Sequence, residues 1–296
     1  MATEKFLKYL EYEKRYSAHT LTAYRSDLEQ FFIYLNSQFE TNELIEINHF
    51  YIRSWIVSLM EAKLNTRSVN RKITVLKSFF KFLMREKVVE LNPMIKIQSP
   101  KNSKRLPVFV DKLKMKEVLD PENFENSFIG IRNKLIFELF YSTGIRLSEL
   151  SNLKPENINC ATQTIKVLGK RNKERLVPIA APLATLIEQY LTERKKLLEQ
   201  KDIISTLVFL KENGVAVNQK TIYHVVRKHL AKSTTLQKKS PHVLRHTFAT
   251  HMLDNGADIN AVKEILGHSS LAATQVYTHN TIEKLKNVHK LAHPRS

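Results

Sequence analysis

Residues 66–84, TRSVNRKITVLKSFFKFLM, contain the pattern that dominates the first hundred residues. Large apolar side chains recur there at steps of three and four, the spacing of one face of an amphipathic α-helix; they are Val69, Ile73, Leu76, Phe79, Phe80 and Leu83. The cations that lie off this stripe are Arg67, Arg71, Lys77 and Lys81. The stretch therefore predicts a helix with a core side and a basic side.

The same spacing recurs in Ser17–Leu35, with Ser17 or Thr20 as the helix cap. The periodicity stops near residue 93, and residues 99–107, SPKNSKRLP, supply two prolines and three cations. Such a stretch is typical of a linker. We expect a helical N-terminal domain at 1–98, a basic linker at 99–107 and a second domain at 108–296.

The second domain mixes two patterns. Asn133–Tyr141 has helical spacing, whereas residues 164–179, TIKVLGKRNKERLVPI, alternate, turn and alternate again, which is typical of a β-hairpin with strands at Thr164–Leu168 and Arg175–Ile179. Helical patterns return from Thr221 onward. The predicted fold class is mainly α, with a small antiparallel β-sheet in the C-terminal domain.

The composition restricts the class of partner. The 296 residues include 47 Lys and Arg against 29 Asp and Glu, a net charge of +18, which attracts polyanions such as nucleic acid. Ribosomal assembly factors, membrane-surface proteins and proteins with solvated lysine faces have similar net charges, so the charge indicates a class of partner and not a function. The single cysteine, Cys160, excludes a disulfide scaffold, and neither a signal peptide nor a membrane span is recognisable. We expect a cytoplasmic protein with no membrane partner.

Candidate chemistry begins at residues 143–150, TGIRLSEL, where Arg146 follows the glycine turn at Gly144. A guanidinium offers a rigid fork of donors that fits two phosphate oxygens. A structural alternative pairs Arg146 with Glu149 on the same helix face.

A second candidate lies in residues 239–253, KSPHVLRHTFATHML, where Ser240 and Pro241 predict a helix start. His242 and Arg245 share a face near free N-terminal amides, which favour an anion. His242 and His246 could instead bind zinc, but no nearby carboxylate or cysteine completes a ligand set of known spacing. We therefore expect no metal and no cofactor.

Tyr277 lies nine residues after His268, and Lys170 lies at the predicted hairpin tip. Cations lower the cost of a tyrosinate, an imidazole can take its proton, and attack on a phosphodiester would give a phosphotyrosine. Arginines could hold the charge of the transition state, and Lys170 could protonate the leaving oxygen. The sequence has neither a GxxxxGKS loop nor a clustered carboxylate pair for two magnesium ions.

In order along the chain, these residues resemble the active-site set of the tyrosine recombinases, the phage integrase family: Arg146, Lys170, His242, Arg245, His268 and Tyr277. Further segments are similar to the Xer group, including NGAD at 255–258, LGHSSLAATQVYTH at 266–279 and HPRS at 293–296. The resemblance covers nearly the whole chain. It implies a helical, SAM-like core-binding domain and a catalytic domain that form a clamp around double-stranded DNA.

The resemblance also assigns roles. Arg146 and Arg245 would hold the scissile phosphate, Lys170 would protonate the 5′-oxygen, His242 and His268 would assist, and Tyr277 would attack, while Glu149 would support the first arginine. We expect DNA contacts from Arg25, Arg67, Arg71 and Lys77. Two departures from the Xer pattern are Arg171, where glycine is common, and Asn280, where an apolar residue is usual.

The tail carries an apolar stripe, Ile282, Leu285, Val288 and Leu291, which predicts a short helix. Folded back on its own domain, this helix would be ordinary packing. The resemblance implies instead that residues 281–291 are exchanged between subunits of a tetramer on two paired sites. A second Xer-type recombinase and a DNA translocase are further implied partners.

The expected function is site-specific recombination through a covalent 3′-phosphotyrosyl intermediate, resolving chromosome or plasmid dimers. The integrase of a mobile element would use the same chemistry. A type IB topoisomerase, or a DNA-binding protein without catalysis, would also fit a basic chain of this kind.

Overall fold

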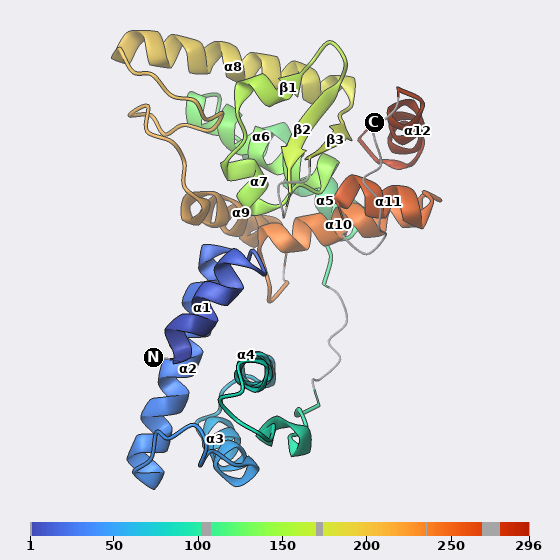
Figure 1. Ribbon diagram of the computed structural model, residues 1–296. Coiled ribbons are helices and arrows are strands. Elements are labelled where there is room, and N and C mark those ends of the chain that lie inside the picture. Colours follow the sequence, from blue (N-terminus) through green and yellow to red (C-terminus); the bar gives the residue numbers. More distant parts are fainter. Residues whose placement is uncertain (1, 102–107, 170–173, 235, 268–278, 296) are drawn as a thin grey trace. The chain divides into compact units, whose positions relative to one another are not determined.

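The computed structural model describes residues 2–101, 108–169, 174–234, 236–267 and 279–295. The chain divides into two compact units, Met1–Arg105 and Leu106–Ser296, each with its own apolar core (Figure 1). The division falls within residues 99–107, the predicted linker, of which 102–107 lie outside the described residues.

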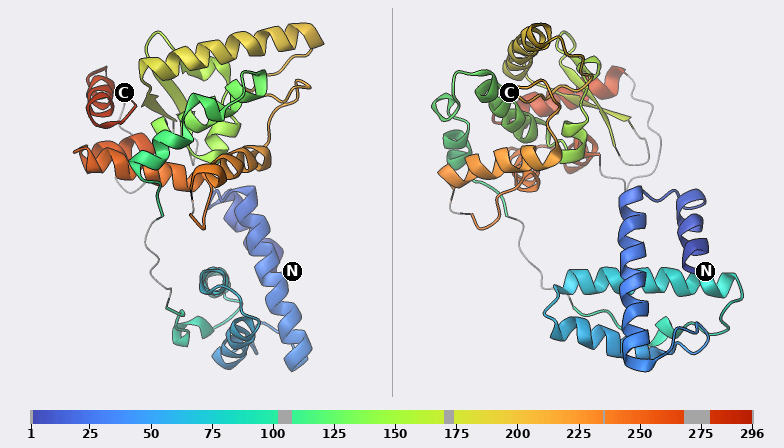
Figure 2. Two further views of the ribbon diagram at one scale, coloured as in Figure 1. Left: turned by 180° about the vertical axis from the view of Figure 1, so that it is seen from behind. Right: turned by 90° about the vertical axis from the view of Figure 1, so that its left-hand side faces the viewer.

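The N-terminal unit is built from helices in which α2 packs against α1, α3 and α4 (Figure 2, right). Its elements are α1 (Ala2–Tyr12), α2 (Ala18–Phe39), α3 (His49–Glu61), α4 (Thr66–Arg85) and the short 3-10 helix η1 (Pro93–Lys96). Ser17 caps α2, since its side chain accepts from the backbone N–H of Thr20, and Asn65 caps α4 in the same way. All six apolar residues predicted to face the core from α4 are buried, which confirms the predicted stripe.

The C-terminal unit surrounds a small sheet with helices. Its elements are α5 (Lys112–Val118), η2 (Pro121–Asn123), α6 (Phe128–Thr143), α7 (Leu147–Ser151), η3 (Pro155–Asn157), β1 (Ile158–Asn159), β2 (Thr164–Leu168), β3 (Glu174–Pro178), α8 (Ala181–Lys201), α9 (Gln219–Ser233), α10 (Pro241–Asp254), α11 (Ile259–Leu266) and α12 (His279–Ala292). The strands pair antiparallel in the order β1-β2-β3, which confirms the predicted hairpin. The β3 strand begins and ends one residue earlier than predicted.

Helix α6 runs through the centre of this unit and packs against α8 and α10 (Figure 1). It ends at Gly144, whose φ of +60° is a left-handed conformation that L side chains rarely adopt. A Cβ added there would come within 2.6 Å of Leu266 and 2.7 Å of Phe248. Only glycine therefore allows the end of α6 to approach the end of α11 so closely.

Helix α12 lies against β3, α10 and α11 of its own unit. The predicted apolar stripe was wrong at Leu291, which is 86% exposed, although Leu285 is buried. His289, Ala292 and His293 are buried instead. The side chain of Ile282 lies outside the described residues.

No helix in the described part of the chain is long and apolar enough to cross a membrane.

Candidate active site

The candidate site forms where the turn after α6 meets the end of α11. Arg146 occupies the N-cap position of α7, and its backbone N–H donates to Oε2 of Glu149 at 2.8 Å. The Arg146 guanidinium donates to Oε1 of the same carboxylate at 2.8 Å. The pairing expected as the structural alternative is therefore present, and it orients Arg146 without burying it, because 28% of its side chain remains exposed.

Glu149 has a second partner that sequence reasoning missed. Arg175, on β3, donates to both carboxylate oxygens of Glu149, each at 2.8 Å. Both side chains are nearly fully buried, with 5% of Arg175 and 3% of Glu149 exposed. Burial alone would raise the pKa of Glu149, but the hydrogen bonds and charge of Arg175, followed by those of Arg146, lower it to about 2.

The strand pattern contains one signal that could have indicated the role of Arg175. Arg175 occupies an inward position of a strand whose burial alternates, and a charged residue at such a position needs a buried partner. The partner itself was not predictable locally, because Glu149 lies 26 residues away in the sequence.

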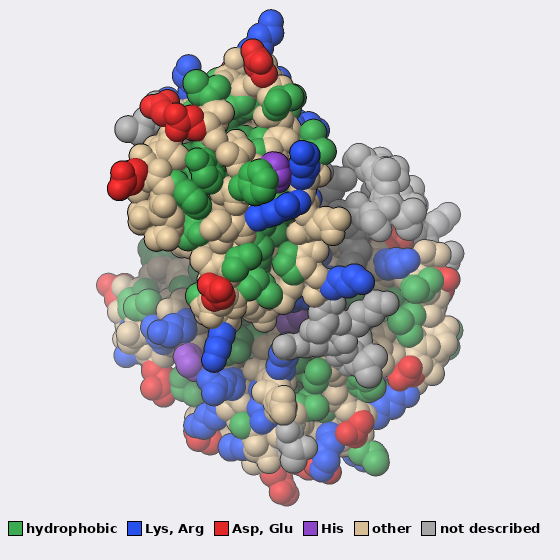
Figure 3. Space-filling view, turned by 90° about the horizontal axis from the view of Figure 1, so that it is seen from below, with side chains coloured by type: hydrophobic (Ala, Val, Ile, Leu, Met, Phe, Trp, Pro, Cys, Tyr) green, Lys and Arg blue, Asp and Glu red, His purple; other side chains and the backbone are tan. Residues whose placement is uncertain are grey.

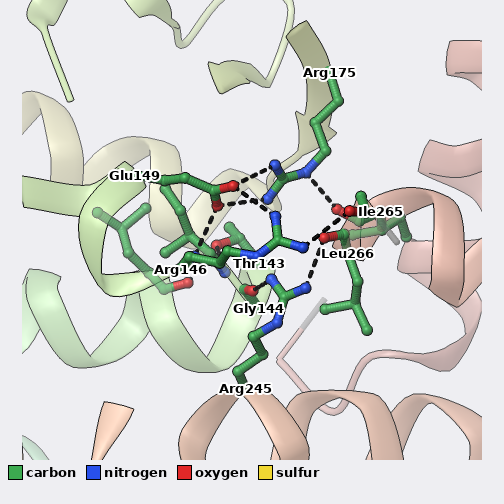
Figure 4. Close-up of polar contacts among 11 residues, drawn as sticks. Thr143, Gly144, Arg146, Glu149, Arg175, Arg245, Ile265 and Leu266 are labelled. Carbon is green, nitrogen blue, oxygen red and sulfur yellow. Dashed lines mark hydrogen bonds and ion pairs between the residues drawn. The ribbon is translucent and has the colours of Figure 1, made fainter. Parts of the chain in front are cut away.

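Three arginines converge on the C-terminal end of α11, as Figure 4 shows. Arg175 donates to the carbonyl of Ile265 at 2.8 Å, Arg245 to that of Leu266 at 2.7 Å, and Arg146 to that of Gly267 at 2.9 Å. The last carbonyls of a helix lack intrahelical partners and carry its negative dipole end. The three guanidiniums, from α10, β3 and the α6–α7 turn, thus hold three consecutive carbonyls.

Gly267 makes this convergence possible. Its φ is +65°, and a Cβ there would lie 3.0 Å from Cδ of Arg175 and 3.2 Å from the guanidinium. The left-handed turn therefore lets the backbone of α11 lie directly against an arginine side chain.

Arg245 differs from its two neighbours because no carboxylate among the described residues pairs with it. It donates to the carbonyls of Gly144 and Leu266 and is only 7% exposed. Burial, together with the charges of Arg146 and Arg175, lowers the pKa of Arg245 to about 9. Arg245 therefore stays charged at neutral pH, in a place where a further anion would be stabilised.

An open groove of about 510 Å³ adjoins this cluster. Its lining includes Arg146, Ser148 and Lys154, together with Lys166 and Gly169 of the hairpin. Glu149, Glu156 and Glu174 also line it, and Lys154 and Lys166 pair with the last two. Among the described residues, the surplus positive charge therefore lies in the adjoining arginine cluster rather than in the groove wall.

Of the other four predicted catalytic residues, the structure describes His242 alone. His242 is exposed on the first turn of α10, and its ring lies 4.5 Å from that of His246. Although the residue is exposed overall, partial desolvation of its ring, followed by the charges of His246 and Arg245, lowers the pKa of His242. Lys170, His268 and Tyr277 lie outside the described residues, although Gly169 and Gly267 directly precede the first two and belong to the site.

The N-terminal cations predicted to contact DNA are exposed on their helices. Arg25 pairs with Glu4, and Arg71 pairs with the buried Asp27. Arg67 and Lys77 have no carboxylate partner among the described residues. In the space-filling view of Figure 3, Lys and Arg side chains are spread over the surface and are more frequent than acidic ones.

Within the described residues, no group of three His, Cys, Asp or Glu side chains could hold a metal ion. His242 and His246 therefore have no third ligand of these types in that part of the chain.

Both units of the chain match known protein families. The phage integrase family matches residues 112–284, and the N-terminal SAM-like domain of phage integrases matches residues 3–87. The chain belongs to the phage integrase family. The first match contains the whole arginine cluster, and the second covers α1 to α4.

Curated relatives narrow the assignment to the Xer group of tyrosine recombinases. The tyrosine recombinase XerC of Anoxybacillus flavithermus is 37% identical over 294 residues, which are 98% of this chain and 97% of that protein. XerC of Oceanobacillus iheyensis is 38% identical, over 99% of this chain and 96% of its own. The chain is a tyrosine recombinase, an enzyme that cleaves and rejoins DNA strands.

Solved structures share the fold. The XerH recombinase bound to its palindromic difH substrate has a TM-score of 0.72 at 23% identity, covering 98% of this chain and 84% of that one. The Tn1549 transposon integrase with circular intermediate DNA has a TM-score of 0.72 at 18% identity, covering 96% and 98%. The mainly helical architecture with a small antiparallel sheet is thus the fold of tyrosine recombinases.

Proposed function

We propose that the enzyme is a site-specific recombinase of duplex DNA in which Tyr277 attacks the scissile phosphate and forms a 3′-phosphotyrosyl intermediate. The observation that carries this proposal is the arginine cluster at the end of α11, because its surplus positive charge suits a phosphate. Arg146 and Arg245 hold the non-bridging oxygens. Arg175 donates to both carboxylate oxygens of Glu149 and so holds in place the side chain that orients Arg146.

The proposed reaction exchanges one phosphoester for another. The phenolic oxygen of Tyr277 bonds to phosphorus while the bond from phosphorus to the 5′-oxygen breaks. His268, with His242, assists removal of the phenolic proton, and Lys170 gives a proton to the leaving 5′-oxygen. A 5′-hydroxyl from the exchanged strand then attacks phosphorus and releases Tyr277. The phosphotyrosine conserves the bond energy, so this scheme uses neither a nucleotide nor a metal.

Prior orientation of the arginines supports an electrostatic role. The Arg245 guanidinium already donates to Gly144 and Leu266, and Arg146 already donates to Glu149 and Gly267. Donors held in place before the transition state forms need no reorganisation during the reaction. Removing one such donor typically costs about 10²–10³ in rate.

Binding of duplex DNA would engage both units. We assign Arg25, Arg67, Arg71 and Lys77 to phosphate contacts, since all four are exposed on α2 and α4. Such contacts position the protein on DNA and supply affinity that falls with salt.

The proposed cellular role is resolution of chromosome or plasmid dimers in the cytoplasm. The recombinase would work as a tetramer on two paired sites, with residues 281–291 exchanged between subunits, alongside a second Xer-type recombinase and a translocase. Relatives named XerC that match over nearly the full length support this role. They do not favour a mobile-element integrase.

The test is trapping of the covalent intermediate on a nicked recombination site. Tyr277→Phe should abolish the adduct while DNA binding persists, because only the nucleophilic oxygen is lost. Tyr223→Phe is the matched control, since Tyr223 lies partly exposed on α9 and should leave the adduct unchanged. An adduct at the normal level from Tyr277→Phe would overturn the assignment.

Two conditions distinguish a recombinase from a topoisomerase or a simple DNA-binding protein. Cleavage should proceed in EDTA, and a strict requirement for a divalent ion would contradict the scheme. Relaxation of a supercoiled plasmid without a recombination site would indicate a topoisomerase instead. A protein that only binds DNA would form no adduct on any substrate.

A further inference from the structure

The end of α6, which leads into the Arg146 turn, is capped by the C-terminal tail. The carbonyls in the last turn of a helix have no intrahelical partners. Two of them, on Tyr141 and Ser142, accept hydrogen bonds from histidines: Nε2 of His293 lies 3.0 Å from the Tyr141 oxygen, and Nε2 of His289 lies 2.7 Å from the Ser142 oxygen. The tail thereby satisfies carbonyls that burial would otherwise isolate from water.

Both histidines are arranged as donors. The backbone N–H of Arg295 donates to Nδ1 of His293 at 3.1 Å, so Nδ1 carries no proton and Nε2 carries one. A carbonyl oxygen can only accept, which requires a proton on Nε2 of His289 as well. The two rings stack with their centroids 4.9 Å apart and their planes 4° from parallel. Only 2% of His289 and 5% of His293 is exposed.

Two further contacts anchor the same segment. Nδ2 of Asn255, just after α10, donates to the carbonyl of Ala292 at 2.7 Å. The Arg295 guanidinium pairs with Glu138 of α6, whose side chain is 6% exposed. His293 and Arg295 therefore bind along α6, to the Tyr141 carbonyl and to the Glu138 side chain.

The capped carbonyls lie immediately before the arginine turn. Ser142 precedes Gly144 by two residues, and the Gly144 carbonyl accepts from Arg245. No side chain fits at Gly144, because Leu266 and Phe248 are too close to a Cβ there. The backbone from Ser142 to Arg146 consequently has little freedom to absorb a shift of the end of α6.

We propose that His289 and His293 are positioning residues for recombination: by capping the end of α6 they fix the turn that carries Arg146. The inference rests on the phosphate-binding role of Arg146 proposed above. Neither histidine touches DNA in this proposal. In the exchanged tetramer proposed above, the same two histidines would cap α6 of the neighbouring subunit. A bound tail, its own or a neighbour's, is then a condition for an ordered arginine cluster, which links the C-terminus of the chain to the chemistry.

The test uses full-length variants that keep or remove the hydrogen-bond donor at constant side-chain length. His289→Gln and His293→Gln place an amide N–H near the position of Nε2, whereas His289→Met and His293→Met do not. Single-turnover cleavage is measured at saturating DNA on a nicked site. We expect each Met variant to cleave at least tenfold more slowly with DNA affinity within threefold, and each Gln variant to recover most of the rate.

A second substrate distinguishes positioning from general damage. It carries a methylphosphonate at the scissile position, which removes the charge that the arginines hold. If the histidines act through Arg146, the defect of the Met variants should shrink to less than threefold on this substrate. Equal defects on both substrates, or a normal rate of the Met variants on the phosphate, would overturn the proposal.

Two controls separate the possible failures. Arg146→Ala should be slow on the phosphate and largely recovered on the methylphosphonate; if it is not recovered, the role of Arg146 itself is wrong. Tyr190→Phe removes buried hydrogen bonds to Val208 and Leu210, far along the chain from the arginine turn, and should leave cleavage unchanged.

If the Met variants do not fold, His293→Asn replaces them, since its shorter amide cannot reach the Tyr141 carbonyl. A normal cleavage rate for His293→Asn would likewise contradict the proposal.

Discussion

Each unit of the protein contains a buried carboxylate that lies between two cations. The two clusters differ in how far their surplus cation is exposed to solvent. In the N-terminal unit, Asp27 accepts from Lys72 at 2.8 Å and pairs with Arg71. Lys72 also donates to Gln30 at 2.6 Å and lies 5.7 Å from the ring of Trp55. The surplus cation is Arg71, whose side chain is 47% exposed and therefore solvated.

In the C-terminal cluster the cations are less exposed than Arg71, with 28% of Arg146 and 5% of Arg175 accessible. Glu149 pairs with Arg146 and Arg175, and Arg245 lies beside them with carbonyl partners alone among the described residues. Its surplus charge is buried or faces the groove lined by Arg146. A buried charge is costly unless it is paired, so binding of an anion beside Arg245 would be favourable. The comparison separates a cluster whose surplus charge is solvated from one whose surplus charge suits the phosphate of the proposed reaction.

The largest expected contrast is between Arg245→Ala and Arg71→Ala. Arg245→Ala should slow single-turnover cleavage by about 10²–10³ while DNA affinity changes little, because other cations still hold the DNA. Arg71→Ala, in the solvated cluster, should leave the cleavage step of bound complexes unchanged. Rapid quenching of reactions at saturating DNA measures both rates. A normal rate for Arg245→Ala would place Arg245 with Arg71 as a structural cation.

Removing the carboxylates should reveal what the two clusters share. Asp27→Asn and Glu149→Gln each leave a buried cation without its counter-charge, which typically costs about 3–5 kcal/mol of stability. Urea unfolding should show a comparable loss for both. Only Glu149→Gln should also slow cleavage, because Arg146 loses its anchor. If Asp27→Asn slowed cleavage of bound DNA equally, the distinction between the clusters would fail.

Acid should destabilise the C-terminal unit before the N-terminal one. Burial, followed by the charge of His289, lowers the pKa of His293 to about 3, and burial also lowers the pKa values of His289 and His251. Unfolded histidine titrates near pH 6.5, so below about that pH the unfolded chain binds more protons and stability falls. The loss continues until the folded pKa is reached, at up to roughly 1.4 kcal/mol per pH unit for each histidine.

Two probes follow the units separately. Trp55, the only tryptophan, is buried in the N-terminal unit, and its fluorescence reports that unit. Hydrogen exchange of α6 reports the other. The protection factors of the α6 amides, which correct for the slower intrinsic exchange in acid, should fall between pH 7 and pH 5 before the fluorescence changes, and His293→Gln should weaken this response. Simultaneous changes in both probes would show that the histidines do not set the acid sensitivity.

The smallest expected effects concern the N-terminal surface. Arg67→Ala should reduce the slope of log affinity against log salt by roughly one unit, the value for one lost phosphate contact. Arg25→Ala should reduce it less, because Arg25 shares its charge with Glu4. Fluorescence anisotropy on duplex DNA at several salt concentrations measures both slopes. Unchanged slopes for both variants would remove these residues from the DNA interface.

Local patterns were sufficient for many elements. The spacing of Val69, Ile73 and Leu76 predicted which face of α4 is buried, and alternation predicted the β2–β3 hairpin. Both predictions depend on the side-chain periodicity within single helices or strands, and the backbone geometry of each element fixes that periodicity. The order of six polar residues along the chain also indicated the family before any fold was known.

Other features depended on contacts between distant segments. Lys72 is adjacent to the exposed Arg71 in the sequence, yet it is buried because Asp27 lies 45 residues away on the facing helix. The tail was predicted to pack through Leu291, but His289 and His293 are buried instead, because the uncapped carbonyls of α6 need donors that leucine lacks.

The sequence by itself determined the helices, the hairpin, the basic surface and the family, because each is expressed in local spacing or in the order of residue types along the chain. Only the tertiary structure decided that Arg175 joins Glu149 and the carbonyl of Ile265, from which it is separated by 26 and 90 residues. It also decided that the tail caps α6. The physical reason is that periodicity specifies which face of an element is buried, whereas the partner of a buried charge or carbonyl is chosen by how the elements pack.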